Sequence, residues 1–218
     1  TGGTVTVMSM GPAQAEDVLR ESLSVGADEA YLVSGREFGG SDTLATSYIL
    51  SCAVKAVEEK RGEKFDVIYC GKQAIDGDTG QVGPEMAEHL GYTQITYATE
   101  LVACEGDKVQ VRKETADGYD VLEAALPVVI SVTKTPFELR YPTVKKRLAA
   151  NRAQIPTITP QDMEGQIDLS RAGLKGSPTN VFMSFGKQAK AAGTVLKGLS
   201  ADEAVAAIMD KLIQRHII

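Results

Sequence analysis

Short apolar runs alternate with helical patterns along the first half of the chain, and this alternation restricts the fold more than any other feature. Residues 4–10, 30–33 and 67–70 are expected to form short buried strands. Apolar residues recur at helical spacing between these runs, and a further helical segment follows the third run. Strands separated by helices pair in parallel, and helices then cover both faces of the sheet. The sequence therefore predicts an α/β fold with an open parallel sheet.

The segment after the third predicted strand, residues 71–83, is rich in Gly and Asp and leads into a helix expected to begin at Gln81. Its backbone N–H groups and the positive end of the helix dipole would favour a phosphate or pyrophosphate. Turns of this composition also occur simply to reverse the chain, so spacing alone leaves a structural turn as the alternative. The segment is neither a Walker loop nor a Gly-x-Gly-x-x-Gly fingerprint.

Residues 71–84 resemble the signature segment of the beta subunit of electron-transfer flavoproteins. Three further stretches agree with that family in order and spacing, and these are residues 7–12, 26–30 and 140–143. The resemblance covers nearly the whole chain and implies a nucleotide-binding sheet whose pocket lies at the carboxyl ends of the strands. The cofactor-binding residues that it implies are Met10, Gly71, Lys72, Gln73, Ala74, Ile75, Asp76, Gly77, Asp78, Thr79, Gly80, Gln81, Val82 and Gly83.

The family begins with one more strand, loop and helix, and its first strand and the loop after it form one wall of the nucleotide pocket. The sequence opens at Thr1 without that unit. We expect either that the sequence is a fragment or that the unit is missing for another reason. The turn after Met10 would face the pocket from the remaining side, although by itself it reads as a helix-starting turn.

Composition excludes several classes of function. A net charge of −6 argues against nonspecific nucleic-acid binding. No apolar run approaches the roughly 18 residues that a membrane span needs, so we expect a soluble, cytoplasmic protein. The three cysteines and two histidines are spaced too widely to indicate a disulfide framework, a metal site or a Ser-His-Asp triad.

In the second half of the chain, the spacing of apolar residues changes from helical periodicity to alternation. Residues 101–104, 109–113 and 119–125 alternate and predict an antiparallel ribbon, followed by a central apolar strand at 127–132. Residues 134–152 hold six basic residues and one acid, which by charge alone indicates a solvated loop. The resemblance instead implies a recognition loop that docks on flavoenzymes. Its partner-docking residues are Arg140, Tyr141, Val144, Lys145, Lys146 and Arg147.

Residues 151–218 are predicted to form a C-terminal arm beyond a nucleotide-binding domain at 1–150. Pro, Thr and Gly are frequent there, which is typical of weakly structured segments. The resemblance implies that the arm packs on the alpha subunit. A last helix is expected after a capping box formed by Ser200 and Glu203, and this helix could equally cover its own domain.

The resemblance implies an electron carrier that works as a heterodimer with an alpha subunit carrying its own FAD. The beta subunit would supply no catalytic residue. Its pocket would hold AMP in housekeeping members, or a second FAD that accepts hydride from NADH in electron-bifurcating members. Residues 76–84 resemble the bifurcating type more closely, so FAD is expected. The expected electron-transfer partners are an acyl-CoA dehydrogenase or another flavoenzyme.

Two other classes of function remain open. An ATP-binding enzyme or stress-type protein of the same fold would explain the signature segment, but not the ribbon, the basic segment or the arm. A structural adaptor would explain the arm and the basic segment, but would leave the pocket empty.

Overall fold

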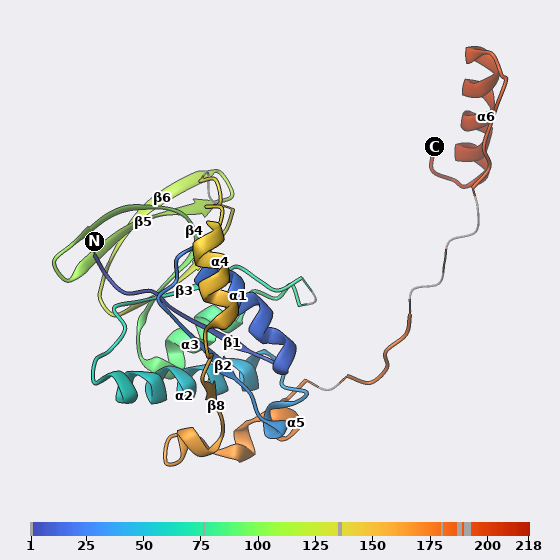
Figure 1. Cartoon of the computed structure of the whole chain (residues 1–218). Coiled ribbons are helices and arrows are strands. Elements are labelled where there is room, and N and C mark those ends of the chain that lie inside the picture. Colours follow the sequence, from blue (N-terminus) through green and yellow to red (C-terminus); the bar gives the residue numbers. More distant parts are fainter. Residues whose placement is uncertain (1, 76, 135–136, 180, 187–188, 190–192) are drawn as a thin grey trace. The chain divides into compact units, whose positions relative to one another are not determined.

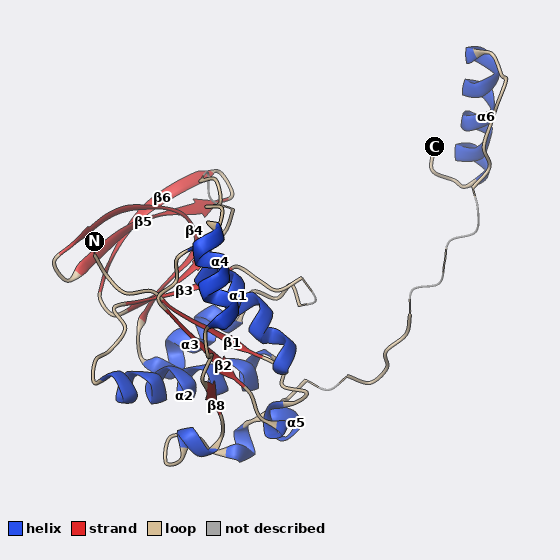
Figure 2. Ribbon diagram, viewed as in Figure 1, coloured by secondary structure: helices blue, strands red, loops and turns tan. Residues whose placement is uncertain are grey.

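A computed structural model describes residues 2–75, 77–134, 137–179, 181–186, 189 and 193–218. The chain divides into two compact units, residues 1–180 and 181–218 (Figure 1). The first unit contains two sheets with helices packed alongside (Figure 2). The predicted α/β class is confirmed.

The first sheet contains three parallel strands in the order β1-β2-β8, which are β1 (Thr6–Met10), β2 (Glu29–Val33) and β8 (Thr157–Ile158). Helix α1 (Glu16–Val25) packs against the side of β2 that carries Ala30 and Leu32. Helix α2 (Thr43–Arg61) contributes to the core that contains Val33, which points to the other face. The sheet is therefore covered on both faces, as its sequence pattern predicts.

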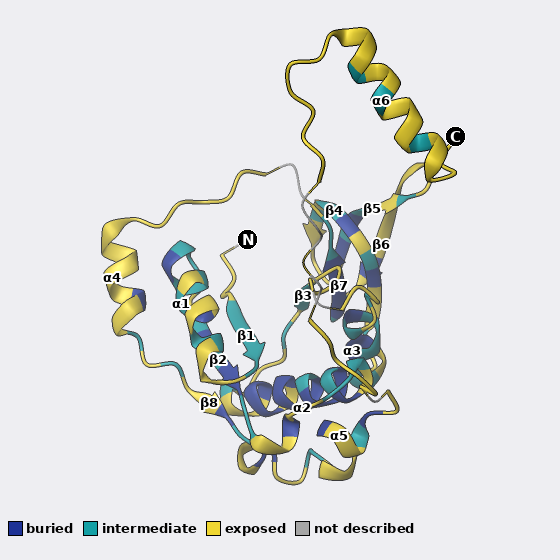
Figure 3. Cartoon of the chain, turned by 90° about the vertical axis from the view of Figure 1, so that its right-hand side faces the viewer, coloured by how far each residue is buried: buried dark blue, intermediate teal, exposed yellow. Residues whose placement is uncertain are grey.

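Helix α2 is the most buried helix of the first unit (Figure 3). Its apolar stripe faces the core, since Ala45, Ile49, Cys52, Ala53 and Ala56 are all buried. The helix is capped at its start, because the Asp42 carboxylate accepts a hydrogen bond of 3.0 Å from the backbone N–H of Ala45.

The second sheet has the strand order β3-β7-β4-β5-β6. Its strands are β3 (Val67–Gly71), β7 (Val128–Val132), β4 (Thr93–Glu105), β5 (Lys108–Thr115) and β6 (Gly118–Ala125). Strand β7 pairs in parallel with both β3 and the start of β4, which confirms its predicted central position. The end of β4 pairs antiparallel with β5, and β5 with β6, so the predicted ribbon is present. Helix α3 (Val82–Leu90) packs against β7 and β4.

Strand β4 begins earlier than the sequence pattern predicts. Residues 93–98 pair in parallel with β7 before the strand enters the ribbon. The change occurs at Tyr97, whose φ of 60° interrupts the register between Ile95 and Ala98. Apolar residues of the ribbon, such as Val109 and Val111, share one core with Ile130 of β7. The ribbon thus buries one face within its own unit.

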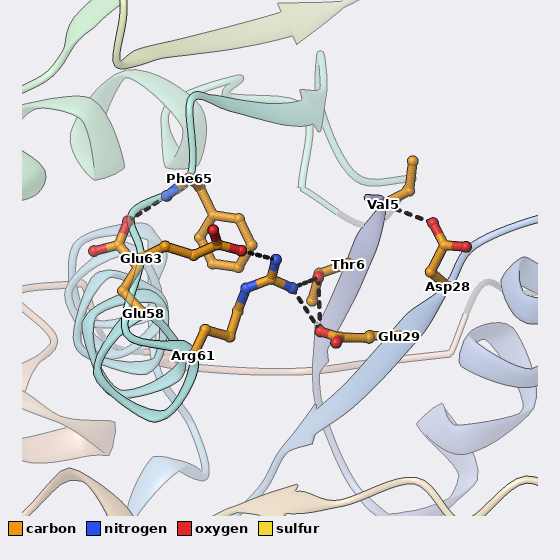
Figure 4. Close-up of polar contacts among 8 residues, drawn as sticks. All are labelled: Val5, Thr6, Asp28, Glu29, Glu58, Arg61, Glu63 and Phe65. Carbon is orange, nitrogen blue, oxygen red and sulfur yellow. Dashed lines mark hydrogen bonds and ion pairs between the residues drawn. The ribbon is translucent and has the colours of Figure 1, made fainter. Parts of the chain in front are cut away.

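The described strands form two sheets, whereas the sequence predicts one open sheet. Strands β1 and β3 are both edge strands, and no described strand pairs with both. Arg61, at the end of α2, links this helix to the starts of β1 and β2 (Figure 4). Its guanidinium donates hydrogen bonds to Glu29 at 2.7 Å, to Thr6 at 2.9 Å and to Glu63 at 2.6 Å.

The basic segment contains a helix, α4 (Val144–Arg152), and is therefore not the continuous loop that charge alone suggested. The hydroxyl of Thr143 caps this helix by accepting a hydrogen bond of 3.2 Å from the Lys146 backbone N–H. Helix α4 packs on α1, and Arg20 of α1 donates hydrogen bonds to the carbonyls of Ala150 and Ala153 at 2.9 and 2.7 Å.

Much of the segment that follows belongs to the first unit. Strand β8 pairs with β2, and Met163 and Ala172 are buried in the same core as α2. The remaining short elements of this unit are η1 (Ala13–Ala15), η2 (Arg36–Phe38), η3 (Gln161–Met163), η4 (Leu169–Arg171) and α5 (Gly173–Gly176). The structure groups residues 1–180 in one compact unit, and the division into functional domains after residue 150 stays a prediction.

The second unit contains helix α6 (Ala201–Gln214), which has no buried residue. Its predicted capping box is confirmed. The Ser200 N–H donates to the Glu203 carboxylate at 2.8 Å, and the Glu203 N–H donates to the Ser200 hydroxyl at 3.4 Å. Across the described part of the chain, every helix is too short or too polar to cross a membrane.

Candidate nucleotide site

The signature segment, residues 71–83, leaves the carboxyl end of β3 and leads directly into α3. Its described residues between 71 and 81 are exposed, apart from the half-buried Gly80. Thr79 and Gln81 face solvent rather than the protein interior. The predicted residue Asp76 lies outside the described residues. The segment therefore presents its backbone where a ligand of a parallel sheet is expected.

The backbone N–H groups of residues 79–83 are suited to an anion. None of them donates a hydrogen bond to another described residue. Gln81 is the N-cap residue of α3 and makes no side-chain cap; its side-chain oxygen instead accepts a hydrogen bond of 3.3 Å from Thr43. The first turn of α3 thus offers N–H groups together with the positive end of the helix dipole.

Two glycines allow the segment to lie close to the sheet. Gly80 has a φ of +67°, and a Cβ there would lie 3.2 Å from the backbone oxygen of Lys72. A Cβ on Gly83 would lie 2.6 Å from the sulfur of Cys70. Side chains at these positions would displace either the loop or the start of α3. The backbone itself therefore forms the cradle, which fits the phosphate of a nucleotide.

Cys70 supports α3 rather than reacting. Burial raises the pKa of its thiol to about 11, so the thiol stays protonated at neutral pH. The sulfur lies 3.7 Å from the carbonyl oxygen of Ile130, to which the thiol donates.

Tyr97 lies beneath the signature segment and was not predicted as part of the site. Its hydroxyl lies 3.8 Å from the position of a Cβ on Gly80. The ammonium groups of Lys72 and Lys113 lie 4.9 and 6.0 Å from the centre of its ring. The Tyr97 N–H donates to the Ser131 hydroxyl at 3.1 Å, which fixes the backbone. Tyr97 differs from an ordinary strand residue by its positive φ, and nothing in the sequence predicts that conformation.

A cavity of about 700 Å³ lies on the ribbon side of the signature segment, and we call it the ribbon-side pocket. It lies beyond the carboxyl ends of β3 and β7, next to the turn between β5 and β6. Its lining combines cationic, hydroxyl, amide and aromatic groups, supplied by Lys72, Gln73, Thr99, Arg112, Glu114, Gly118, Tyr119, Val132, Thr133 and Lys134. Of these, only Lys72 and Gln73 were predicted as site residues. The others come from segments far apart in sequence.

A smaller and mostly apolar cavity of about 190 Å³ shares Thr99 and Val132 with this pocket. Met10, by contrast, lines neither cavity. It belongs to β1 of the other sheet, and its side chain packs against the core around α2. Its role at the nucleotide site stays a prediction.

The six predicted docking residues are all exposed. Tyr141 and Val144 have exposed fractions of 90% and 78%, which is unusual for large apolar side chains. Phe137 and Leu139, which the sequence analysis did not single out, are 68% and 90% exposed in the same stretch of the chain, and Phe137 also lines the smaller cavity.

Comparison with known proteins identifies the family. The chain matches the electron transfer flavoprotein domain over residues 1–163. It is 48% identical over 217 residues to the electron transfer flavoprotein subunit beta of Megasphaera elsdenii, covering 98% of this chain and 79% of that protein.

Two other relatives carry names of larger reductase assemblies. The acryloyl-CoA reductase electron transfer subunit gamma of Anaerotignum propionicum is 41% identical over 222 residues, covering 100% of this chain and 81% of the relative. The caffeyl-CoA reductase-Etf complex subunit CarD of Acetobacterium woodii is 40% identical over 217 residues, covering 100% and 80%. The chain therefore belongs to the family of electron transfer flavoprotein beta subunits.

Proposed function

We propose that this subunit binds an adenine nucleotide at the signature segment and passes electrons as part of a heterodimer with an electron transfer flavoprotein alpha subunit. The donors would be NADH or acyl-CoA dehydrogenases, and the acceptors would be partner flavoenzymes. The observation that carries the proposal is the backbone of residues 79–83 at the start of α3, where Thr79 and Gln81 are exposed and no N–H group donates to another described residue.

We propose FAD rather than AMP as the nucleotide. The names of the relatives from acryloyl-CoA reductase and caffeyl-CoA reductase complexes support this, as does the local sequence of residues 76–84. A bound flavin would supply the electron-accepting chemistry, including bifurcation of electron pairs from NADH. The residues of this chain would hold the phosphates with the amides of 79–83 and keep the segment close to β3 through Gly80 and Gly83.

Electron delivery would use the exposed docking residues. Val144, at the start of α4, would enter an apolar site on the flavoenzyme, while Lys145, Lys146 and Arg147 would attract its acidic surface. The arm and α6 would pack on the alpha subunit.

The deciding measurement is the nucleotide content of the purified heterodimer. Two FAD per heterodimer would support the bifurcating function, whereas one FAD with one AMP would exclude it while keeping nucleotide binding at this site. A colourless monomer that uses ATP would favour the ATP-binding class instead.

A glycine pair tests the location of the site. Gly80→Ala should lower the nucleotide content, because its Cβ meets the Lys72 backbone and forces the segment to move. Gly91→Ala is the matched control, since Gly91 has a similar φ of +69°, open surroundings and a position at the far end of α3. Both variants should lose a similar stability, on the order of 1 kcal/mol. Full nucleotide content in Gly80→Ala would contradict the assignment.

A further inference from the structure

The ribbon-side pocket carries more positive charge than its surroundings explain. Three cationic side chains line it, against the single carboxylate of Glu114, in a chain whose net charge is −6. The cations come from three separate segments, because Lys72 follows β3, Lys134 follows β7, and Arg112 lies on β5. Like charges converge on one cavity at an energetic cost, so their convergence indicates an anionic ligand.

One of the three cations, Arg112, already has partners in the wall of the pocket. The Arg112 guanidinium forms an ion pair of 2.8 Å with Glu100 and lies 4.4 Å above the centre of the Tyr119 ring. Arg112 therefore orients Tyr119, which lies directly across from Glu114 on the ribbon. This leaves Lys72 and Lys134 as the cations that can hold an anion.

The backbone of Lys72 is also fixed by a hydrogen bond. Its backbone N–H donates to the carbonyl of Val132 at 2.9 Å, and its ammonium lies above the Tyr97 ring. Beyond the end of β7 at Val132 the chain continues through Thr133 to Lys134, so both lysines lie just past neighbouring strand ends. Thr133, directly before Lys134 in the chain, adds a hydroxyl to the lining of the pocket.

We propose that the ribbon-side pocket binds a phosphate-bearing ligand, with the phosphate held by Lys72 and Lys134 and the rest of the ligand lying against Tyr119. A phosphate monoester carries about −1.5 to −2 charges, which two ammonium groups can balance. The cavity volume of about 700 Å³ lies within the range of roughly 300 to 1,000 Å³ that small-molecule sites occupy. Position supports the same conclusion, since ligands of open parallel sheets bind beyond the carboxyl ends of the strands.

The phosphate has two possible sources with the same chemistry. It belongs either to the nucleotide that the proposed function places at the signature segment, which shares Lys72 with this pocket, or to a second phosphorylated molecule. The first case deepens the proposed function, and the second adds a separate site.

The test uses inorganic pyrophosphate as the probe, titrated by calorimetry at fixed ionic strength into the heterodimer after its nucleotide has been removed. Lys134→Ala should weaken binding about tenfold or more, because a charge-assisted contact is lost, whereas Lys134→Arg should keep most of the affinity. The matched control is Lys108→Ala, which removes a lysine from the other end of the same ribbon, where it pairs with Glu123. The control should bind pyrophosphate as the unmodified protein does.

Three results would overturn the proposal: no pyrophosphate binding by the unmodified heterodimer, equal binding by Lys134→Ala, or an equal loss in Lys108→Ala, which would indicate nonspecific attraction. The nucleotide-loaded heterodimer then separates the two sources. If it no longer binds pyrophosphate, the pocket serves the resident nucleotide, and if it still binds through Lys134, the ligand is a second molecule. Because this readout does not measure flavin content, the pocket and the proposed function can fail independently.

Discussion

The close approach of α3 to β3 predicts that a single methyl group at Gly83 disturbs the site. In the structure, a Cβ at this position would lie 2.6 Å from the sulfur of Cys70 and 3.6 Å from the Cβ of Ser131. Normal contacts between such atoms are about 3.5 to 4.0 Å, so the sulfur and the methyl overlap by about 1 Å. Gly83→Ala must therefore push the start of α3 away from the sheet.

The magnitude follows from two opposing effects. Overpacking of this kind costs about 1 to 3 kcal/mol. Alanine in place of glycine in a helix recovers roughly 0.5 to 1 kcal/mol. The net loss is about 0 to 2.5 kcal/mol, with a central value of about 1, and for a chain of this size each kcal/mol lowers the melting temperature by about 2 to 4 °C.

Removing the sulfur should remove the effect. In a Cys70→Ala background the methyl of residue 83 enters the space that the thiol leaves, so Gly83→Ala should cost little or nothing there. The assay is thermal unfolding of the heterodimer at one protein concentration for the two single variants and the double variant, together with nucleotide content. An unchanged melting temperature in Gly83→Ala, or the same loss with and without Cys70, would refute the packing argument.

Three further predictions concern other parts of the chain. Arg61→Met should lower the melting temperature, because Glu29 and the hydroxyl of Thr6 each lose a hydrogen bond at a cost of about 1 to 3 kcal/mol, and an unchanged value would contradict this role. Burial lowers the pKa of His89 below its usual 6.5. As the pH falls, the unfolded state therefore takes up the proton first, and the stability of the folded state should fall below about pH 6.5. The melting temperature of His89→Gln should depend less on pH in this range. Reversing the charges of Lys145 and Lys146 should slow electron delivery to flavoenzymes, most strongly at low salt, and leave the flavin content unchanged. The control is Lys64→Glu, which changes an exposed lysine elsewhere. Equal slowing in that control would refute the docking assignment.

Local sequence patterns correctly predicted the elements whose conformation depends on residues close by in the chain. The capping box at Ser200 is confirmed because, like the Asp42 cap and the apolar stripe of α2, it depends on residues within one or two helical turns. The helix after the signature segment begins at Val82, one residue from its predicted start. The fully apolar run in β7 identified a central strand for the same reason, since both of its faces are buried.

Local patterns failed where a distant partner decides the conformation. Residues 93–98 become a strand only by pairing with β7, and residues 157–158 by pairing with β2. The positive φ of Tyr97 is tolerated because β4 must change its partner there. Helix α4 has a weak apolar pattern and is placed by its contacts with α1, including those from Arg20.

The sequence by itself determined the alternation of strands and helices and the glycine-rich backbone of the signature segment, because both depend on residue type and local spacing. Only the tertiary structure decided that Lys72, Arg112 and Lys134 line one cavity and that Gly83 meets Cys70. Those neighbours are set by which strands pair and in which register, and no local pattern along the chain contains that information.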